Sequence, residues 1–476
     1  MPPFTSAMLR RLRPLTLGAL CAAAAMACGD TTAPVSPSGA PVPDVSDAAS
    51  LAWRSPATPG TMRDAVLAWN DVITAFFHPP VFVPAQPPPV DARGYAMASV
   101  AMHDALNAID RRYAPYAFDG MASDRVSGEA TIAAAVHGVL VSLGGSLPGP
   151  VAFANQKYEE ALAAIPDGAE KSDGIALGQA VASAVLAARA ADGSAGPPAM
   201  PYTSPGTPGA FRPLIPPPSA IEFSGFAALP HWGAQRPFVL QLPSQFRANA
   251  PYGAPTLADA VRTPEYLADY AETKALGGMV SERTDEQTEI GLFWIESSAQ
   301  GWNRVARAIL AQRQQTAWRT ARLLAQMHLA IADAYIANFD SKYHWDFWRP
   351  VTAIRLGNMD PSTPGDPTWN VTSVAAGLGP TPPVPEWPSA HAMAGAAAAE
   401  AIKASIPGST AFEMTSTVGT GLPRRYVSVD AAVTDNNLSR VYVGFHWRAA
   451  TVEGERLGRL LGDYVVENSL QAVREN

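Results

Sequence analysis

Most of this 476-residue chain repeats one pattern, with apolar residues spaced at i, i+3, i+4 and i+7. Such spacing places apolar side chains on one face of an α-helix. The segments are rich in alanine, and the β-branched alternation typical of strands is scarce. We therefore predict an all-α protein. The expected helices cover residues 62–73, 92–109, 129–143, 151–165, 171–191, 256–276, 285–296, 302–340, 390–405 and 451–470.

One stretch departs from this pattern. Residues 195–255 contain many prolines and show little helical period. A connection of this length in a compact protein is usually a functional loop or a link between separate units. The prediction is therefore two packed helical bundles, residues 61–194 and 256–476, joined by the Pro-rich irregular segment.

The first 27 residues are typical of a signal peptide. Three arginines at positions 10–13 precede an apolar run too short to span a bilayer, and small residues flank the bond before Cys28. The residues ending in Cys28 resemble a lipobox, although an ordinary secretory peptide would leave Cys28 as a free thiol. Residues 28–60 have the composition of a tether. We expect an exported protein, periplasmic or at the cell surface, with a lipid anchor at Cys28 as its contact with a membrane.

Composition excludes several function classes. The only two cysteines are Cys21, in the leader, and Cys28, so the mature domain has no thiol for disulfides, zinc or nucleophilic catalysis. A net charge of -8 without basic runs argues against nucleic-acid binding. No HExxH, P-loop or GxSxG pattern occurs. The adjacent His103 and Asp104 are interpreted as a packed histidine beside a carboxylate.

Three short clusters in the last third carry the remaining candidates. In the first, Lys342 and Arg349 are seven residues apart, so one helix would project them from the same face, with Pro350 ending it. In the second, Ser389 is a plausible N-cap that exposes the first backbone N–H groups of a helix to an anion.

In the third cluster, Arg440 and His446 are six residues apart, which on a straight helix would aim them to different faces. A kink, for which Gly444 is available, would be needed to bring both to one site. Taken singly, each cluster also has a purely structural reading: a solvated cationic face, a helix cap, or a packed histidine beside a surface arginine.

Together the clusters supply three cations, neutral hydrogen-bond donors and two imidazoles. That set suits a tetrahedral oxyanion such as phosphate or vanadate, because each cation at ~4 Å contributes roughly 4 kcal/mol at an effective dielectric constant of about 20. Acyl transfer has no use for so much positive charge. One imidazole would bind or attack the central atom, and the other would move protons.

Lys-x6-Arg-Pro, Pro-Ser-x-His and Ser-Arg-x5-His resemble the signature of the superfamily that joins vanadium-dependent haloperoxidases to type 2 phosphatidic acid phosphatases. The aromatic residues around the first two clusters resemble those of the bacterial haloperoxidases most. This resemblance implies a vanadate cofactor, with hydrogen peroxide, halide and a small organic acceptor as partners, and a hypohalous species as product. A homodimer is compatible with it.

The resemblance also implies a role for each residue. His446 would be the axial ligand of vanadium, and His391 the acid–base group that deprotonates hydrogen peroxide. Lys342 would also polarise the peroxide. The equatorial oxygens would be held by Lys342, Arg349, Arg440, the Ser389 hydroxyl and the Ala390 backbone N–H.

Two positions depart from the family pattern. Ala390 replaces a usual glycine, and Ala450 replaces an aspartate that would orient His446. Glu453 is a candidate substitute and Glu296 a candidate to brace an active-site arginine, but we expect both at the surface and assign them no site role. Two alternatives therefore stay open: a soluble acid phosphatase acting through a phosphohistidine, and a non-catalytic scaffold that binds an oxyanion.

Overall fold

The computed structural model confirms the all-α prediction. It describes residues 62–78, 87–122, 125–145, 147–213, 225–357, 363–377, 380–408, 410–418 and 421–473. These residues form fifteen α-helices, three short 3-10 helices and two small two-stranded sheets. The expected signal peptide, Cys28 and the tether lie outside the described residues.

The α-helices are α1 (Met62–Phe77), α2 (Pro88–Ile109), α3 (Gly128–Gly144), α4 (Pro148–Ala163), α5 (Ala169–Arg189), α6 (Leu257–Ala260), α7 (Pro264–Leu276), α8 (Asp285–Phe293), α9 (Ser298–Ala311), α10 (Ala317–Trp345), α11 (Pro350–Leu356), α12 (Thr372–Ala375), α13 (Ala390–Ser405), α14 (Val429–Tyr442) and α15 (Arg448–Asn468). The 3-10 helices are η1 (Trp232–Ala234), η2 (Pro243–Phe246) and η3 (Pro251–Gly253).

Both sheets are antiparallel pairs of three-residue strands. β1 (Ala199–Pro201) pairs with β2 (Phe226–Ala228), and β3 (Phe412–Met414) pairs with β4 (Arg424–Tyr426). The first pair and the 3-10 helices lie within the Pro-rich segment, where the described residues form no α-helix, as expected. The bundle boundaries at residues 194 and 256 stay a prediction.

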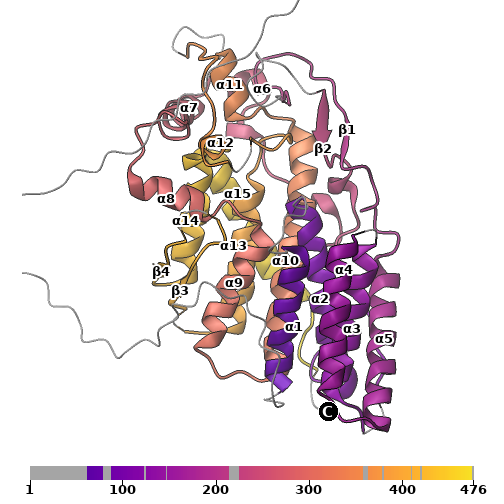
Figure 1. Ribbon diagram of the computed structural model, residues 1–476. Coiled ribbons are helices and arrows are strands. Elements are labelled where there is room, and N and C mark those ends of the chain that lie inside the picture. The colour runs from indigo at the N-terminus through magenta and orange to yellow at the C-terminus, as the bar shows by residue number, and fades with distance from the viewer. Residues whose placement is uncertain are drawn as a thin grey trace, which may run out of the picture. The chain divides into compact units, whose positions relative to one another are not determined.

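Helix α10 is the central element (Figure 1). It packs against α2 from the N-terminal group of helices and against α13 from the C-terminal group. The N-terminal helices α2, α3 and α5 pack on one another, and α13 and α15 form the closest pair of the C-terminal group. Helix α10, whose last turn contains Lys342, is therefore held between the two groups of helices.

Two predicted helices are each divided in the structure. The segment 302–340 is interrupted after Ala311, and α10 begins again behind Thr316, whose side chain accepts a hydrogen bond from the Arg319 backbone N–H. The segment 256–276 is divided into α6 and α7 because Thr263 caps a new helix that starts at Pro264. Proline is favoured at a first helical position and disfavoured further inside.

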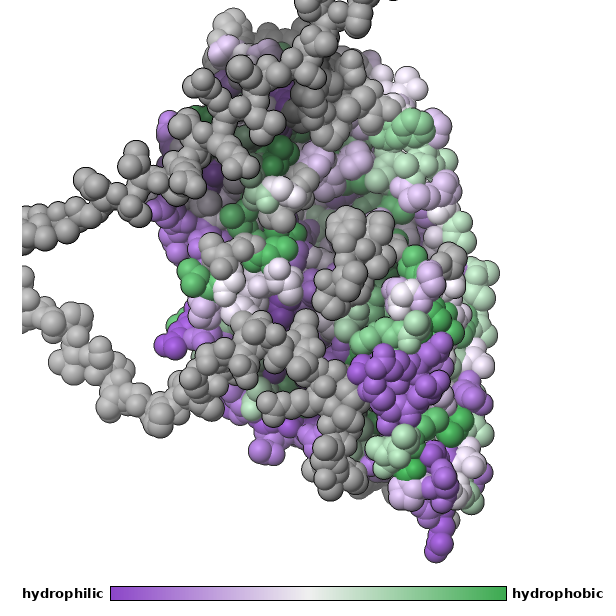
Figure 2. All heavy atoms as spheres, in the orientation of Figure 1, coloured by the Kyte–Doolittle hydropathy of each residue, from purple (hydrophilic) through white to green (hydrophobic). Residues whose placement is uncertain are grey.

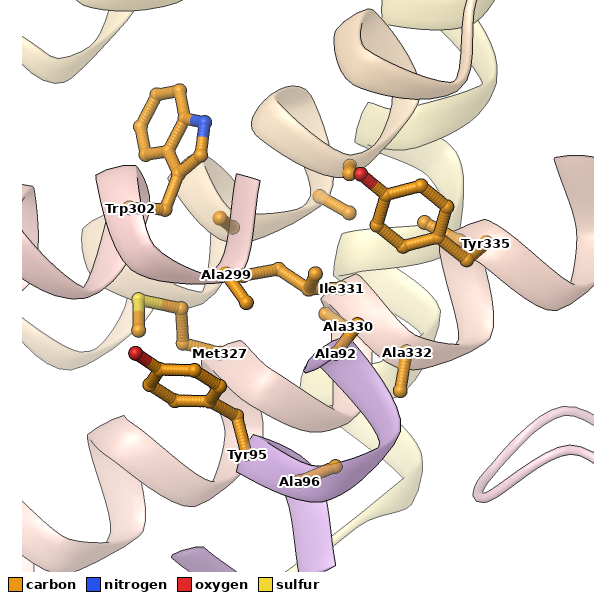
Figure 3. Packing of buried hydrophobic residues seen from close by; sticks show 14 of the residues in the cluster. Ala92, Tyr95, Ala96, Ala299, Trp302, Met327, Ala330, Ile331, Ala332 and Tyr335 are labelled. Atoms are coloured by element: carbon orange, nitrogen blue, oxygen red, sulfur yellow. The ribbon is translucent and has the colours of Figure 1, made fainter. Parts of the chain in front are cut away.

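The core is built from small and aromatic side chains. In Figure 3, Tyr95 of α2 lies beside Met327 of α10, and Trp302 of α9 belongs to the same buried cluster. Alanines such as Ala330 let the helix axes approach closely, while the aromatic rings fill the wider gaps. The adjacent His103 and Asp104 form a buried pair at 3.0 Å, which confirms their structural reading.

On the surface, hydrophilic and hydrophobic residues are interspersed over the N-terminal helices (Figure 2). Among the described helices, none has the length and hydrophobicity needed to cross a membrane.

A seam of glycines joins α13 and α15. A Cβ atom at Gly454 would lie 2.6 Å from the oxygen of Ser389, the N-cap of α13. On α13 itself, a Cβ atom at Gly462 would lie 2.7 Å from the Ala397 oxygen, and one at Gly458 would lie 2.2 Å from the Met393 oxygen. Only residues without a Cβ allow this approach. Because Ser389 and His391 lie at the start of α13, the seam also sets their position.

Replacing Gly458 with alanine is expected to lower the free energy of unfolding by about 3 kcal/mol, since the two helices must separate to admit the methyl group. Urea unfolding would measure the loss. Gly149→Ala is the matched control, because a Cβ atom there meets nothing within 4 Å. Equal stability of the two variants would contradict the close approach.

Candidate functional site

Lys342 lies in the last turn of α10 and is buried. Its Nζ donates to the Pro385 oxygen at 2.7 Å and to the Glu386 oxygen at 2.8 Å. An ammonium group has three N–H donors, so one remains for another acceptor. The first cluster is thus fixed to the backbone of the second.

Arg349 does not share a helix with Lys342, contrary to the sequence prediction. Helix α10 ends at Trp345 because Asp346 adopts a left-handed conformation, with φ at 53°. Pro350 starts α11 and does not end a preceding helix, which leaves Arg349 at its N-cap. The turn nevertheless aims the Arg349 guanidinium at the site.

The second cluster behaves as predicted in its local structure. Ser389 is the N-cap of α13, and its side chain accepts a hydrogen bond from the Ala392 backbone N–H. Ala390 is the first helical residue, so its N–H has no acceptor within the helix. The Nδ1 of His391 lies 2.9 Å from the Ser298 hydroxyl, which also accepts a hydrogen bond from Tyr335. That contact orients the ring, which also has a hydrogen bond with the Trp294 backbone.

The third cluster contains the kink that the sequence required. Helix α14 ends at Tyr442, Gly444 adopts a φ of 80°, and the backbone N–H of His446 donates to the Arg440 oxygen at 3.2 Å. The chain therefore folds back on itself, which brings Arg440 and His446 close together. Arg440 is held by a hydrogen bond from its Nη2 to the Trp294 oxygen at 3.0 Å.

Glu386 is the site residue that sequence reasoning missed. Its side chain is fully buried, and its carboxylate accepts hydrogen bonds from Arg349 Nη1 at 3.2 Å and from the Trp447 backbone N–H at 2.9 Å. It also lies 2.8 Å from His446 Nδ1. A signal was present, since an acidic residue inside a motif surrounded by three cations is the expected counter-ion.

Neither of the two other candidate glutamates contacts His446 or Arg440 in an ion pair. Glu296 is buried, not at the surface as expected, and pairs with Arg304 rather than with Arg440. Glu453 is partly exposed and pairs with Arg456 at 2.7 Å. Ala450 is buried, and its carbonyl accepts a hydrogen bond from the Ser389 backbone N–H.

Burial shifts the pKa of every charged group at the site against its charged form. The pKa of Lys342 is lowered well below its usual value by desolvation and by Arg349, and that of Arg440 is lowered to about 9, mainly by desolvation. Desolvation raises the pKa of Glu386 to about 7, although Arg349 and Lys342 oppose the shift.

Burial also lowers the pKa of the two histidines. Desolvation, and then Arg349, Lys342 and Arg440, hold the pKa of His446 well below 6.5. Desolvation and Arg440 lower that of His391 likewise. Both rings are therefore neutral at physiological pH, as a metal ligand and a general base must be. The contacts of Lys342 and Arg349 with Glu386, and of Arg349 with His446, bring residues of the three clusters together.

Comparison with known proteins agrees with this arrangement. Residues 322–475 match the family model described as the VCPO second helical-bundle domain, and this stretch contains all three clusters. A vanadium chloroperoxidase from Curvularia inaequalis is 25% identical over 46% of this chain and 46% of its own length. The last third of the chain is therefore similar to the second helical-bundle domain of vanadium chloroperoxidases.

Solved structures of this haloperoxidase family share the fold. The first bacterial vanadium-dependent iodoperoxidase superposes with a TM-score of 0.69 at 21% identity, covering 88% of this chain and 100% of its own. A bacterial vanadium-dependent chloroperoxidase in its holo form gives 0.60 at 16% identity, covering 80% and 92%. By contrast, the chain spans about half the length of the curated haloperoxidase that it matches.

Proposed function

We propose that this protein is a vanadate-dependent haloperoxidase, which converts hydrogen peroxide, halide and a proton into hypohalous acid and water. The observation that carries the proposal is that residues of the three clusters contact one another: Lys342 and Arg349 donate to Glu386, and Arg349 also lies 3.1 Å from His446 Nε2. The backbone of His446 in turn donates to the Arg440 oxygen. The Curvularia relative is named a chloroperoxidase and a structural neighbour an iodoperoxidase, so the halide of this chain is left open.

The donors present fit a vanadate ion. Lys342 retains one N–H beyond its two backbone bonds, and Arg440 uses two of its five donors on Ser439 and Trp294. The Ser389 hydroxyl and the Ala390 N–H add neutral donors at a helix N-terminus. Arg349 would complete the oxygen contacts, and His446 would bind the metal through Nε2. Bound there, vanadate would supply a Lewis acid that activates hydrogen peroxide.

His391 then does the proton work. Its Nε2 would take a proton from hydrogen peroxide and deliver one to the leaving oxygen, while Ser298 fixes the ring from the opposite side. The remaining N–H of Lys342 would donate a hydrogen bond to bound hydrogen peroxide and polarise it. The low solvent exposure of the surrounding cations strengthens these contacts relative to water.

A phosphatase remains a second candidate because of one observation, the contact of His446 with Glu386. The absence of a carboxylate at position 450 argued against a nucleophilic histidine, and Glu386 removes that objection. In this reading His446 attacks phosphorus and His391 protonates the leaving oxygen.

Purified protein separates these functions. Vanadate is added stepwise, and halogenation of an acceptor is measured with peroxide and chloride, bromide or iodide, while hydrolysis of an aryl phosphate is measured without vanadate. Vanadate-dependent halogenation supports the haloperoxidase. Hydrolysis that vanadate inhibits supports the phosphatase, and vanadate binding with neither activity supports a scaffold. Export, the anchor at Cys28, the organic acceptor and a homodimer belong to the proposal and rest on the sequence alone.

A further inference from the structure

Glu386 touches all three clusters at once. Its backbone oxygen accepts from Lys342, and its carboxylate accepts from Arg349 and from the Trp447 backbone N–H. The remaining contact of the carboxylate is with His446 Nδ1, at 2.8 Å. No other acidic side chain among the described residues lies within 4.0 Å of the His446 ring nitrogens in an ion pair.

These contacts fix which nitrogen of His446 carries the proton. Arg349 Nη1 lies 3.1 Å from Nε2 and 3.5 Å from Nδ1, and since a guanidinium can only donate, the shorter contact favours Nε2 as the acceptor. Nδ1 faces a carboxylate oxygen and therefore acts as the donor. The neutral ring has its proton on Nδ1 and its lone pair on Nε2. That tautomer is the one that can ligate or attack an atom held among the cations.

Nothing at position 450 can take over this role. Ala450 is fully buried and its carbonyl is bonded to Ser389, while Glu453, one turn further on, pairs with Arg456. The orienting carboxylate thus comes from a different segment of the chain, directly before the motif that contains Ser389 and His391.

We propose that Glu386 is the positioning residue of His446, which holds the ring in its Nδ1–H tautomer and replaces the carboxylate absent at position 450. The assignment of Nε2 to vanadium rests on the proposed function, but the tautomer does not. A hydrogen-bonded partner behind a ligating histidine also raises its basicity, and losing such a partner weakens metal binding about 10- to 100-fold.

The tautomer is measured first, without any oxyanion. Protein labelled with ¹⁵N-histidine contains eight histidines, and the His446 signals are assigned by their loss in His446→Gln. We expect the wild type to show a protonated Nδ1 and an unprotonated Nε2. In Glu386→Ala the ring should lose this preference, whereas Glu386→Asp should restore it in part. An unchanged tautomer in Glu386→Ala would overturn the proposal.

Vanadate affinity, measured by calorimetry, is the second readout. Glu386→Gln keeps the volume of the side chain and remains informative should Glu386→Ala fail to fold. Its amide has one oxygen to face three donors, so we expect binding about 10- to 100-fold weaker than in the wild type. Glu453→Gln, which removes a carboxylate seven residues after His446, should bind as the wild type does.

The two proposals fail separately. If wild-type protein binds no vanadate but the tautomer shifts in Glu386→Ala, the haloperoxidase proposal is wrong and the positioning role stands. If vanadate binds equally well to wild type and Glu386→Gln, and the tautomer is the same in both, the positioning role is wrong and the haloperoxidase proposal stands.

Discussion

Replacing His391 with glutamine is expected to lower the turnover of halide oxidation by about 10²- to 10⁴-fold, which is the usual contribution of a positioned general base. Glutamine can keep a hydrogen bond to Ser298, but it cannot accept a proton from hydrogen peroxide. Steady-state kinetics at saturating vanadate would measure the change, so that weaker cofactor binding does not contribute.

The matched control for this variant is His137→Gln. His137 lies on α3, is more exposed, contacts Asn155 at 2.8 Å and stacks on Tyr158, so its loss should leave turnover as it is. Full halogenation by His391→Gln would show that another group, or water, handles the proton.

The second large effect concerns charge. Arg440→Gln is expected to weaken vanadate binding about 10³-fold, because roughly 4 kcal/mol of attraction is lost when one cation at ~4 Å is removed. Equilibrium dialysis with vanadate would measure the dissociation constant. Arg440→Lys restores a cation without the planar fork, so its affinity should lie between those of the wild type and the glutamine variant.

Arg448→Gln serves as the control for charge alone. Arg448 lies two residues after His446 but pairs with Glu272, away from Lys342, Arg349 and Arg440. If both glutamine variants lost affinity to the same degree, the effect would come from net charge at long range, and the direct contact of Arg440 with the oxyanion would be refuted.

The helices could be predicted because their signal is local. Apolar spacing located α2, α3, α5 and α13 to within a few residues of their ends. The breaks were less readable. Thr316 was available as a cap, and Pro264 as a first helical residue, but each lies within a segment whose apolar period continues on both sides. Where a cap competes with a periodic pattern, the pattern alone does not indicate which prevails.

The residues of the site also divide into those with a local sequence signal and those without one. The cations and histidines were predictable because their spacing is preserved in short segments, and the kink at Gly444 followed from a simple count of helical turns. Glu386 could be suspected as a counter-ion, but its contacts with Arg349 and His446 join residues far apart in the sequence and could not be predicted. Ser298 gave no signal at all, since a serine at the start of a helix is commonplace.

The three cations of the candidate site each donate a hydrogen bond to a main-chain oxygen. Lys342 donates to Pro385, Arg349 to Val384 and Arg440 to Trp294. Side chains held by such hydrogen bonds lose their rotational freedom when the chain folds, and not when a ligand binds. Dissociation of a bound oxyanion would consequently return little conformational entropy to these side chains. An oxyanion bound by these residues is therefore expected to dissociate slowly.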